Sequence, residues 1–203
     1  MKLKWILACA GALYLSACSK DLPLPAAKEP AKEVTSQTFT PYKILKGQQY
    51  CDKSNVVPVK ASRLTYKVRF DSSAIYKTSD AGNQRDINKL FGFTDNNSLP
   101  HDNSARFGWR WSDGALRLFA YTYNNGFRSF KELGPVPLGE EINCSITVAG
   151  DKYVFELDGV KTMMPRGSNT PTAEGYLLFP YFGGDESAPH DIVIWMKAET
   201  PKQ

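Results

Sequence analysis

The chain has 203 residues, of which 23% are charged and 42% are hydrophobic, and its formal net charge is +4. A charge this close to balance gives no reason to expect a nucleic acid or a strongly acidic partner. The length suffices for one ordinary domain with a leader segment. The sequence has no phosphate-binding glycine loop and no Gly-x-Ser-x-Gly elbow, so it offers no motif of a nucleotide-binding protein or a serine hydrolase.

The chain opens with the features of a bacterial export signal. Two lysines precede an apolar run at residues 5–15, which is too short to cross a bilayer as a stable helix. The run ends in Leu15-Ser16-Ala17-Cys18, which resembles the lipobox of bacterial lipoproteins, where the cysteine thiol takes the lipid. The alternative is an ordinary secretory signal that is cut after Ala17 and leaves the cysteine free.

The lipobox resemblance implies that residues 1–17 are a signal peptide and that Cys18 is the lipidated first residue of the mature protein. Loss of the two leading lysines would lower the net charge from +4 to +2. A multiply acylated N-terminus holds a protein at a membrane without a transmembrane helix. Ser19 is not the aspartate of an inner-membrane retention signal, so we expect an outer-membrane location. The pair Lys20-Asp21 resembles the export signals of surface-exposed lipoproteins.

Residues 18–45 are expected to form a flexible tether. The segment is rich in proline, alanine and charge and has no apolar period, so it cannot bury a core. Residues 46–203 then remain as one domain. Its two cysteines, Cys51 and Cys144, would lie in a compartment that permits disulfides. We expect them to pair, and two separately buried thiols are the alternative.

Apolar and polar residues alternate along several short runs of the domain, which indicates half-buried strands. Turn pairs such as Asp113-Gly114 and Asp158-Gly159 separate these runs. Many short strands joined by tight turns predict an all-β, antiparallel sandwich or barrel. The apolar positions include Leu64, Tyr66, Val68 and Phe70; Ala105, Phe107, Trp109 and Trp111; Leu116, Leu118 and Ala120; and Ile142, Cys144, Ile146 and Val148.

A long polar loop is expected at residues 71–103. Within it, Ile87, Leu90 and Phe91 have helical spacing, which predicts one or two helical turns at residues 86–91. Loops of this length are often functional, although this one could equally cover the edge of a sheet.

The run from Ile146 to Val160, ITVAGDKYVFELDGV, resembles the strand–turn–strand–turn segment of concanavalin-like jelly rolls. That superfamily includes lectins, glucanases and polysaccharide lyases, and its hairpins of this kind end in an Asp-Gly turn. Residues 176–195 suit the closing strands of such a sandwich. The resemblance implies a concanavalin-like β-sandwich and says little about activity.

Two neighbouring strands, at residues 104–111 and 115–123, are predicted to form a hairpin because only a tight turn separates them. In each strand, the residues that alternate with the core-facing ones point away from the core. Because the strands are neighbours, the outward residues of both would lie on one face of a sheet. Aromatic rings stack on sugars, and guanidinium groups bind carboxylates or sulfates. The alternative is that the 71–103 loop covers these side chains, or that arginine stems shield aromatic surface. The candidate carbohydrate-binding residues are Arg106, Arg110, Arg117, Tyr121 and Tyr123.

The same face carries the residue types of a polysaccharide lyase. β-Elimination from a uronic acid needs a group that neutralises the carboxylate, a base for the α-proton and an acid for the leaving oxygen. Arg106 or Asn103 could neutralise, His101 could be the base, and Tyr121 or Tyr123 could be the acid. The strand at 106–110 shares the spaced arginines of alginate-lyase strands, but the chain has no Gln-x-His strand. A solvated loop histidine is the alternative role of His101.

Two further motifs carry acidic residues. Glu156-Leu157-Asp158 begins like the paired carboxylates of glucanases, but a glycine follows, so the Asp-Gly pair is better interpreted as a turn. The loop at 183–191 offers Asp185, Glu186 and Asp191 as oxygen ligands for a structural calcium ion. Since EF-hand spacing is absent, capping of backbone groups is the alternative. No other cofactor is expected.

These features predict an outer-membrane lipoprotein that displays one concanavalin-like sandwich on a tether. The leading hypothesis for its function is non-catalytic recognition of a polysaccharide, with arginines that would suit an anionic one. A polysaccharide lyase acting on a uronic-acid polymer is the enzymatic alternative. A structural or accessory envelope lipoprotein that docks another protein is the third hypothesis.

Overall fold

The structure of the protein is a computed structural model, which describes residues 38–199. The predicted signal peptide and the predicted lipidation site Cys18 lie outside these residues, as does most of the predicted tether. Within residues 38–199, no helix is both long enough and apolar enough to cross a membrane.

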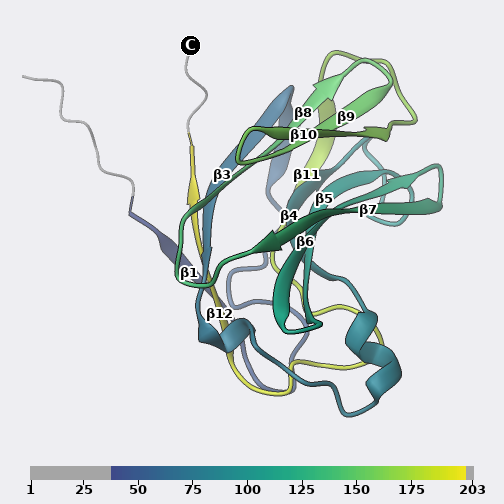
Figure 1. Cartoon of the computed structure of the whole chain (residues 1–203). Coiled ribbons are helices and arrows are strands. Elements are labelled where there is room, and N and C mark those ends of the chain that lie inside the picture. The colour runs from purple at the N-terminus through teal and green to yellow at the C-terminus, as the bar shows by residue number, and fades with distance from the viewer. Residues whose placement is uncertain (1–37, 200–203) are drawn as a thin grey trace, which may run out of the picture. The chain divides into compact units, whose positions relative to one another are not determined.

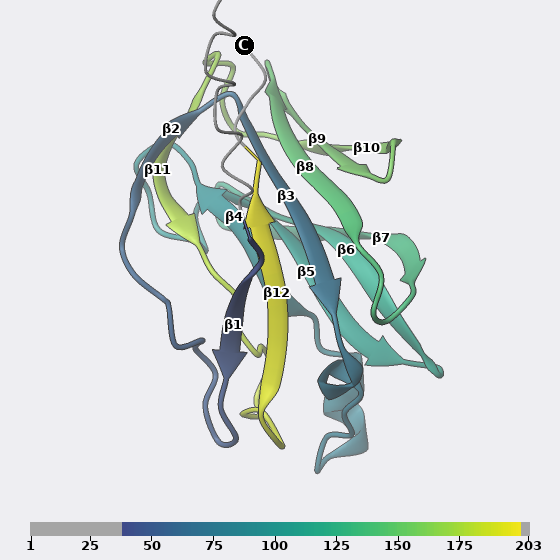
Figure 2. The ribbon, with the colours of Figure 1, turned by 90° about the vertical axis from the view of Figure 1, so that its left-hand side faces the viewer.

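Twelve strands build the domain: β1 (Thr40–Ile44), β2 (Pro58–Ala61), β3 (Arg63–Phe70), β4 (Asn88–Thr94), β5 (Ser104–Ser112), β6 (Ala115–Asn124), β7 (Phe127–Val136), β8 (Ile142–Ala149), β9 (Lys152–Leu157), β10 (Val160–Pro165), β11 (Ala173–Leu178) and β12 (Ile192–Ala198). They form two six-stranded antiparallel sheets (Figures 1 and 2). The first sheet has the order β1-β12-β3-β8-β9-β10, and the second has the order β2-β11-β4-β5-β6-β7. The predicted antiparallel sandwich is confirmed.

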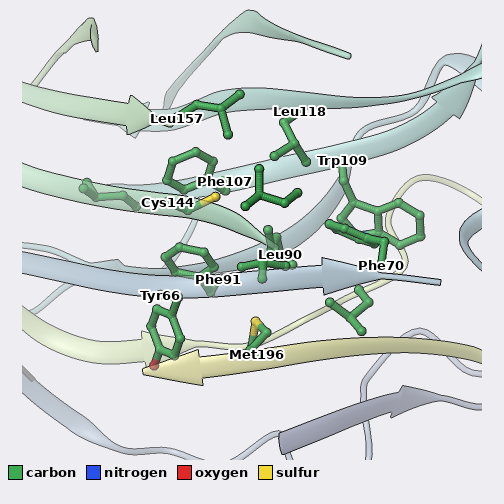
Figure 3. Close-up of a cluster of buried hydrophobic side chains, with 14 of the residues drawn as sticks. Tyr66, Phe70, Leu90, Phe91, Phe107, Trp109, Leu118, Cys144, Leu157 and Met196 are labelled. Atoms are coloured by element: carbon green, nitrogen blue, oxygen red, sulfur yellow. The ribbon is translucent and has the colours of Figure 1, made fainter. Parts of the chain in front are cut away.

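Aromatic and aliphatic side chains fill the space between the two sheets (Figure 3). The ring centroids of Phe70 and Trp109 are 5.5 Å apart, and those of Phe107 and Phe155 are 5.2 Å apart, so both pairs join the two sheets. Ala105, Phe107 and Trp109 are completely buried, which confirms the inward phase predicted for β5. Removing this apolar surface from water is the main stabilising contribution to a sandwich.

The structure corrects the prediction of helical turns at residues 86–91. Most of this segment lies in β4, and short 3-10 helices occur earlier in the chain instead, as η1 (Ser72–Ala74) and η2 (Ala81–Arg85). Both lie at one end of the sandwich (Figures 1 and 2). The predicted 71–103 loop therefore contains a central strand of the second sheet.

A bulge explains why β4 has helical spacing. Its pairing with β5 shifts register between Lys89 and Gly92. A bulge inserts an extra residue and interrupts the alternation of faces. Leu90 and Phe91 are consequently both buried, which produces an apolar pattern unlike that of a regular strand.

The sandwich begins earlier than predicted. β1 lies within the segment assigned to the tether, residues 18–45, and it pairs with β12 from Thr40 opposite Met196 to Ile44 opposite Ile192. The side chain of Ile44 is completely buried. The boundary between tether and domain therefore precedes Thr40.

The predicted disulfide between Cys51 and Cys144 is wrong, because both are free, buried thiols. Asp52 donates its backbone N–H to the carbonyl of Lys43, which places Cys51 beside β1, whereas Cys144 lies in β8. Strands β12 and β3 separate β1 from β8. Three steps between neighbouring strands span about 14 Å, about twice the Cα separation that a disulfide can bridge.

Candidate functional site

The β5–β6 hairpin brings the predicted arginines and aromatics to one face. Its turn, Asp113-Gly114, has positive φ at both residues, 53° and 72°, which matches the twist of two paired strands. Arg106 lies opposite Tyr121, and Arg110 lies opposite Arg117. Since neighbours in register point to the same side, these side chains share the face of the second sheet that is turned away from the core.

Arg106 is buried on this face without a partner. Its exposed fraction is 7%, and its Nε and Nη2 atoms are buried with no hydrogen-bond partner among the described residues. Burial lowers the pKa of the guanidinium group, while nearby tyrosines, with Tyr121 the strongest, act in the opposite direction. The guanidinium carbon lies 5.4 Å from the centroid of the Tyr121 ring. A buried cation without a counter-charge is costly to the fold, so this position invites an anionic ligand.

Lys89 lies next to this arginine and was not predicted as a site residue. Its Nζ atom is 4.5 Å from the centroid of the Tyr121 ring and donates a hydrogen bond to the carbonyl of Ile87. The pKa of Lys89 is lowered to about 8, mainly by burial and also by the charges of Arg106 and Arg128, whereas Asp86 acts in the opposite direction. The sequence does not reveal Lys89, because the bulge in β4 disguises the strand that carries this side chain.

Tyr121 lies at the centre of a row of rings. The centroids of Tyr121 and Tyr123 are 5.9 Å apart, those of Tyr123 and His101 are 5.0 Å apart, and Phe130 stacks on Tyr121 at 6.5 Å. Burial raises the pKa of Tyr121 to about 12, so its phenol keeps its proton at neutral pH. The structure thus brings His101, Tyr123, Tyr121 and Arg106 together.

The face is less open than the strand phase alone predicted. Tyr121 is only 3% exposed, because Lys89 and Phe130 pack against its ring. Ile87 also occupies the space above Gly108, where no Cβ would fit. The segment before β4 therefore covers the Arg110 end of the face, and the end beyond Tyr121, with Tyr123 and the exposed His101, stays accessible.

Arg110 and Arg117 are occupied by partners within the protein, unlike Arg106. Arg110 donates from Nη1 to the carbonyl of Arg85 over 2.7 Å and lies 4.7 Å from the centroid of the Phe119 ring. Arg117 donates from Nη1 to Glu132 over 2.7 Å, and its Nε lies 3.7 Å from Asp113. Of the three predicted arginines, Arg106 therefore has the free hydrogen-bonding capacity that a ligand requires.

Asn103, the alternative group for neutralising a carboxylate, is held in place by hydrogen bonds within the protein. Its Oδ1 atom accepts the backbone N–H of Asn125 over 3.0 Å, and its Nδ2 atom donates to Ser98 over 3.3 Å. The side chain is buried and fixes the turn that follows β6. These bonds engage the Oδ1 atom and one of the two N–H donors of Nδ2.

The acidic residues of the 183–191 loop bind backbone groups. Glu186 accepts the N–H groups of Ser79 and Asp80, each over 2.8 Å, and Asp191 accepts the N–H of Lys46 over 2.8 Å. These bonds lower the pKa of Glu186. Residues 38–199 contain no group of three acidic, histidine or cysteine side chains that could hold a metal ion, Asp185 included. The predicted calcium ligands therefore do not converge.

Two tyrosines extend the face beyond β4. Tyr50 and Tyr181 form one isolated bridge, Tyr181 and Lys89 form another, and the two tyrosine rings meet edge to face at 4.9 Å. Tyr50 is 68% exposed. Both residues come from connecting segments, which carry no period that could place them on a face from the sequence.

No protein-family model and no curated protein matches the chain. Similar solved structures include alginate lyase AlyC3, with a TM-score of 0.56, 13% identity, and coverage of 79% of this chain and 74% of that one. The laminarinase, an endo-1,3-beta-glucanase, of Thermotoga petrophila RKU-1 has a TM-score of 0.52 at 11% identity, and covers 81% of this chain and 78% of its own. A family 16 endo-glucanase of Bacteroides ovatus has a TM-score of 0.50 at 10% identity, covering 80% and 81%. What these proteins share with the chain is the concanavalin-like jelly-roll fold, which confirms the predicted fold class.

Proposed function

We propose that the protein binds an acidic polysaccharide on the outward face of the second sheet, with Arg106 contacting a carboxylate or sulfate group of the sugar. The observation that carries the proposal is the buried guanidinium whose Nε and Nη2 atoms have no hydrogen-bond partner within residues 38–199. These two atoms lie on the same edge of the planar group and suit the two oxygens of one anion. An anion bound there would accept hydrogen bonds from these two atoms and would provide a negative charge beside the guanidinium group.

The residues around Arg106 fit a sugar polymer better than a small ion. Tyr123 is partly exposed, and Phe130 and Tyr50 are 51% and 68% exposed, so aromatic surface is available on both sides of the arginine. Aromatic side chains offer flat apolar surface to sugar rings. The fold is also that of an alginate lyase and of glucanases, whose names place their substrates among the polysaccharides.

Affinity electrophoresis tests the proposal. The wild-type domain should be retarded in gels that contain alginate, polygalacturonate or heparin and should migrate freely through neutral dextran. Arg106→Gln should abolish retardation, because the buried contact is lost. Arg117→Gln is the matched control: it removes the same charge from the same face at a residue already paired with Glu132. Equal retardation of the two variants would contradict the proposed role of Arg106 in binding.

A second candidate, polysaccharide lyase activity, is favoured by the row His101–Tyr123–Tyr121–Arg106. Arg106 would neutralise the uronate carboxylate, and His101 would remove the proton from the carbon beside it. The electron pair of that C–H bond forms a C=C bond as the glycosidic C–O bond breaks, and Tyr121, protonated at neutral pH, gives its proton to the leaving oxygen.

Unsaturated products absorb in the near ultraviolet, so a spectrophotometric assay separates the two candidates. A lyase would raise the absorbance of alginate or polygalacturonate solutions, and both His101→Ala and Tyr121→Phe would stop the rise. A binding protein would be retarded by these polymers without changing them. If neither retardation nor cleavage occurs, the hypothesis of an accessory lipoprotein that docks another protein is favoured.

We also propose that the domain is displayed from the outer membrane through lipid on Cys18. The support is the lipobox Leu15-Ser16-Ala17-Cys18 behind a charged and apolar leader. Labelled palmitate fed to expressing cells should enter the wild-type protein and not Cys18→Ala. Accessibility of the intact protein to added protease on whole cells reports whether it reaches the surface. Equal labelling of both proteins would remove the anchor.

A further inference from the structure

The ammonium group of Lys89 lies inside the candidate site rather than in solvent. Its Nζ atom lies over the Tyr121 ring, and a Cβ built on Gly183 would come within 2.9 Å of it. One of its protons is used by the carbonyl of Ile87. An ammonium group has three donors, so the capacity for further hydrogen bonds remains.

Lys89 belongs to a cluster of three cations on this face. Arg106 on β5 and Arg128 on β7 both lower the pKa of Lys89 through charge repulsion. Within residues 38–199, none of these three side chains takes part in an ion pair. Asp86, just before β4, is the acidic residue that opposes the repulsion. Like charges gathered at one place destabilise the fold unless an anion binds among them.

Lys89 and Arg106 lie around the same aromatic ring. Both cations lie against the same Tyr121 ring, with Nζ at 4.5 Å and the guanidinium carbon at 5.4 Å from its centroid. Lys89 is opposite Gly108, and Gly92 on the same strand is opposite Arg106. Neither glycine contributes a side chain between the two cations, and the space above Gly108 is occupied by Ile87.

We infer that Lys89 is the second anion-binding residue of the site and contacts the same carboxylate or sulfate group of the polysaccharide as Arg106. This inference rests on the proposed function and deepens it. Arg106 supplies a planar fork that fixes the orientation of the anion, and Lys89 supplies a compact charge.

A dependence of affinity on pH follows. In the free protein Lys89 loses its proton near pH 8, since burial, Arg106 and Arg128 disfavour the charged form and Asp86 only partly compensates. A bound anion favours the charged form and therefore raises the pKa of Lys89. Above about pH 8, binding then takes up a proton, and affinity falls with rising pH by up to tenfold per pH unit. Arg106 stays charged throughout, and the phenol of Tyr121 stays neutral up to its raised pKa of about 12.

The test measures the affinity of the full domain for alginate, polygalacturonate and heparin from about pH 6 to about pH 10. Three variants accompany the wild type: Lys89→Met, Lys89→Arg and, as matched control, Lys161→Met on the exposed surface of β10. At neutral pH, Lys89→Met should weaken binding about tenfold or more, and Lys161→Met should leave it unchanged. The alkaline fall of the wild type should be absent in Lys89→Arg, whose charge does not titrate there. Thermal unfolding of all variants checks that they fold.

The two ways of failing are distinguishable. If the wild type binds none of the three polymers at any pH, the proposed function fails and this inference with it. If the wild type binds and Arg106→Gln does not, but Lys89→Met binds as tightly as the wild type with the same pH profile, only the role of Lys89 is overturned.

Discussion

Arg166 donates from Nε to the carboxylate of Asp95 over 2.7 Å, and both side chains are almost completely shielded from solvent. The hydroxyl of Tyr153 donates to the same carboxylate over 2.7 Å. Asp95 follows β4 of the second sheet, whereas Tyr153 lies in β9 and Arg166 follows β10 of the first sheet. This buried network therefore joins the two sheets at one edge of the core.

Breaking this ion pair should cost much of the stability of the domain. Asp95→Asn would leave the guanidinium of Arg166 buried without a counter-charge, and we expect it to lower the free energy of unfolding by about 3–5 kcal/mol in urea denaturation. The exposed pair Lys60–Glu174 provides the control, since its side chains are 70% and 42% exposed. Lys60→Ala should cost less than about 1 kcal/mol. Similar losses in the two variants would contradict the role of the buried pair.

The same carboxylate predicts how stability depends on acid. Burial acts to raise the pKa of Asp95, but hydrogen bonds from Arg166 and Tyr153 outweigh it and lower the pKa below its ordinary value. A lowered pKa contributes stability that is complete above the unfolded-state value of about 4 and is lost as the pH falls through the folded-state value. The wild type should therefore lose stability below about pH 4 more steeply than Asp95→Asn. Parallel curves for the two proteins would show that Asp95 titrates normally.

Arg106 should reduce the stability of the free protein. Arg106→Leu removes a buried cation and two unsatisfied donors, so we expect the free energy of unfolding to rise by about 1–3 kcal/mol while binding of acidic polysaccharide is lost. Arg117→Leu should instead be neutral or slightly destabilising, since it breaks the pair with Glu132. A marked loss of stability in Arg106→Leu would mean that the guanidinium has a partner after all.

Tyr50 should contribute to the affinity for long ligands and not to that for short ones. It is two pairing steps from Lys89, about 10 Å along the row that runs through Tyr181. Tyr50→Ala removes one stacking surface and should weaken binding of an acidic polymer about three- to tenfold, without changing the affinity for a disaccharide of the same sugar. Val160→Ala, at a 68% exposed residue of β10, is the control for loss of an exposed apolar side chain. Equal weakening for short and long ligands would place Tyr50 at the anion contact itself.

The sequence predicts the β5–β6 face well for a physical reason. The turn Asp113-Gly114 is too short to allow any arrangement but a hairpin, and strand phase then determines which side chains share a face. Arg106 and Tyr121 could therefore be paired without a structure. Strand phase does not show whether side chains from other strands pack over a residue. It therefore does not predict that Lys89 and Phe130 bury Tyr121.

Other parts of the site could not be found in this way. The bulge in β4 hides the strand that carries Lys89, and Arg128 lies in β7, whose first six residues are exposed on both sides and so lack apolar alternation. The predicted disulfide failed because sequence alone does not give the order of strands in a sheet. That order puts β12 and β3 between β1, beside which Cys51 lies, and β8, which contains Cys144.

The pairing of Thr40 with Met196 places the start of the first strand beside the end of the last one. Both belong to the first sheet, whereas the cations lie on the far side of the second. A purification tag, a fluorophore or a solid support joined to the domain directly before Thr40 or directly after Ala198 would therefore start from the first sheet, away from the cationic face. Immobilisation by the N-terminus and by the C-terminus should consequently give the same profile on a glycan array.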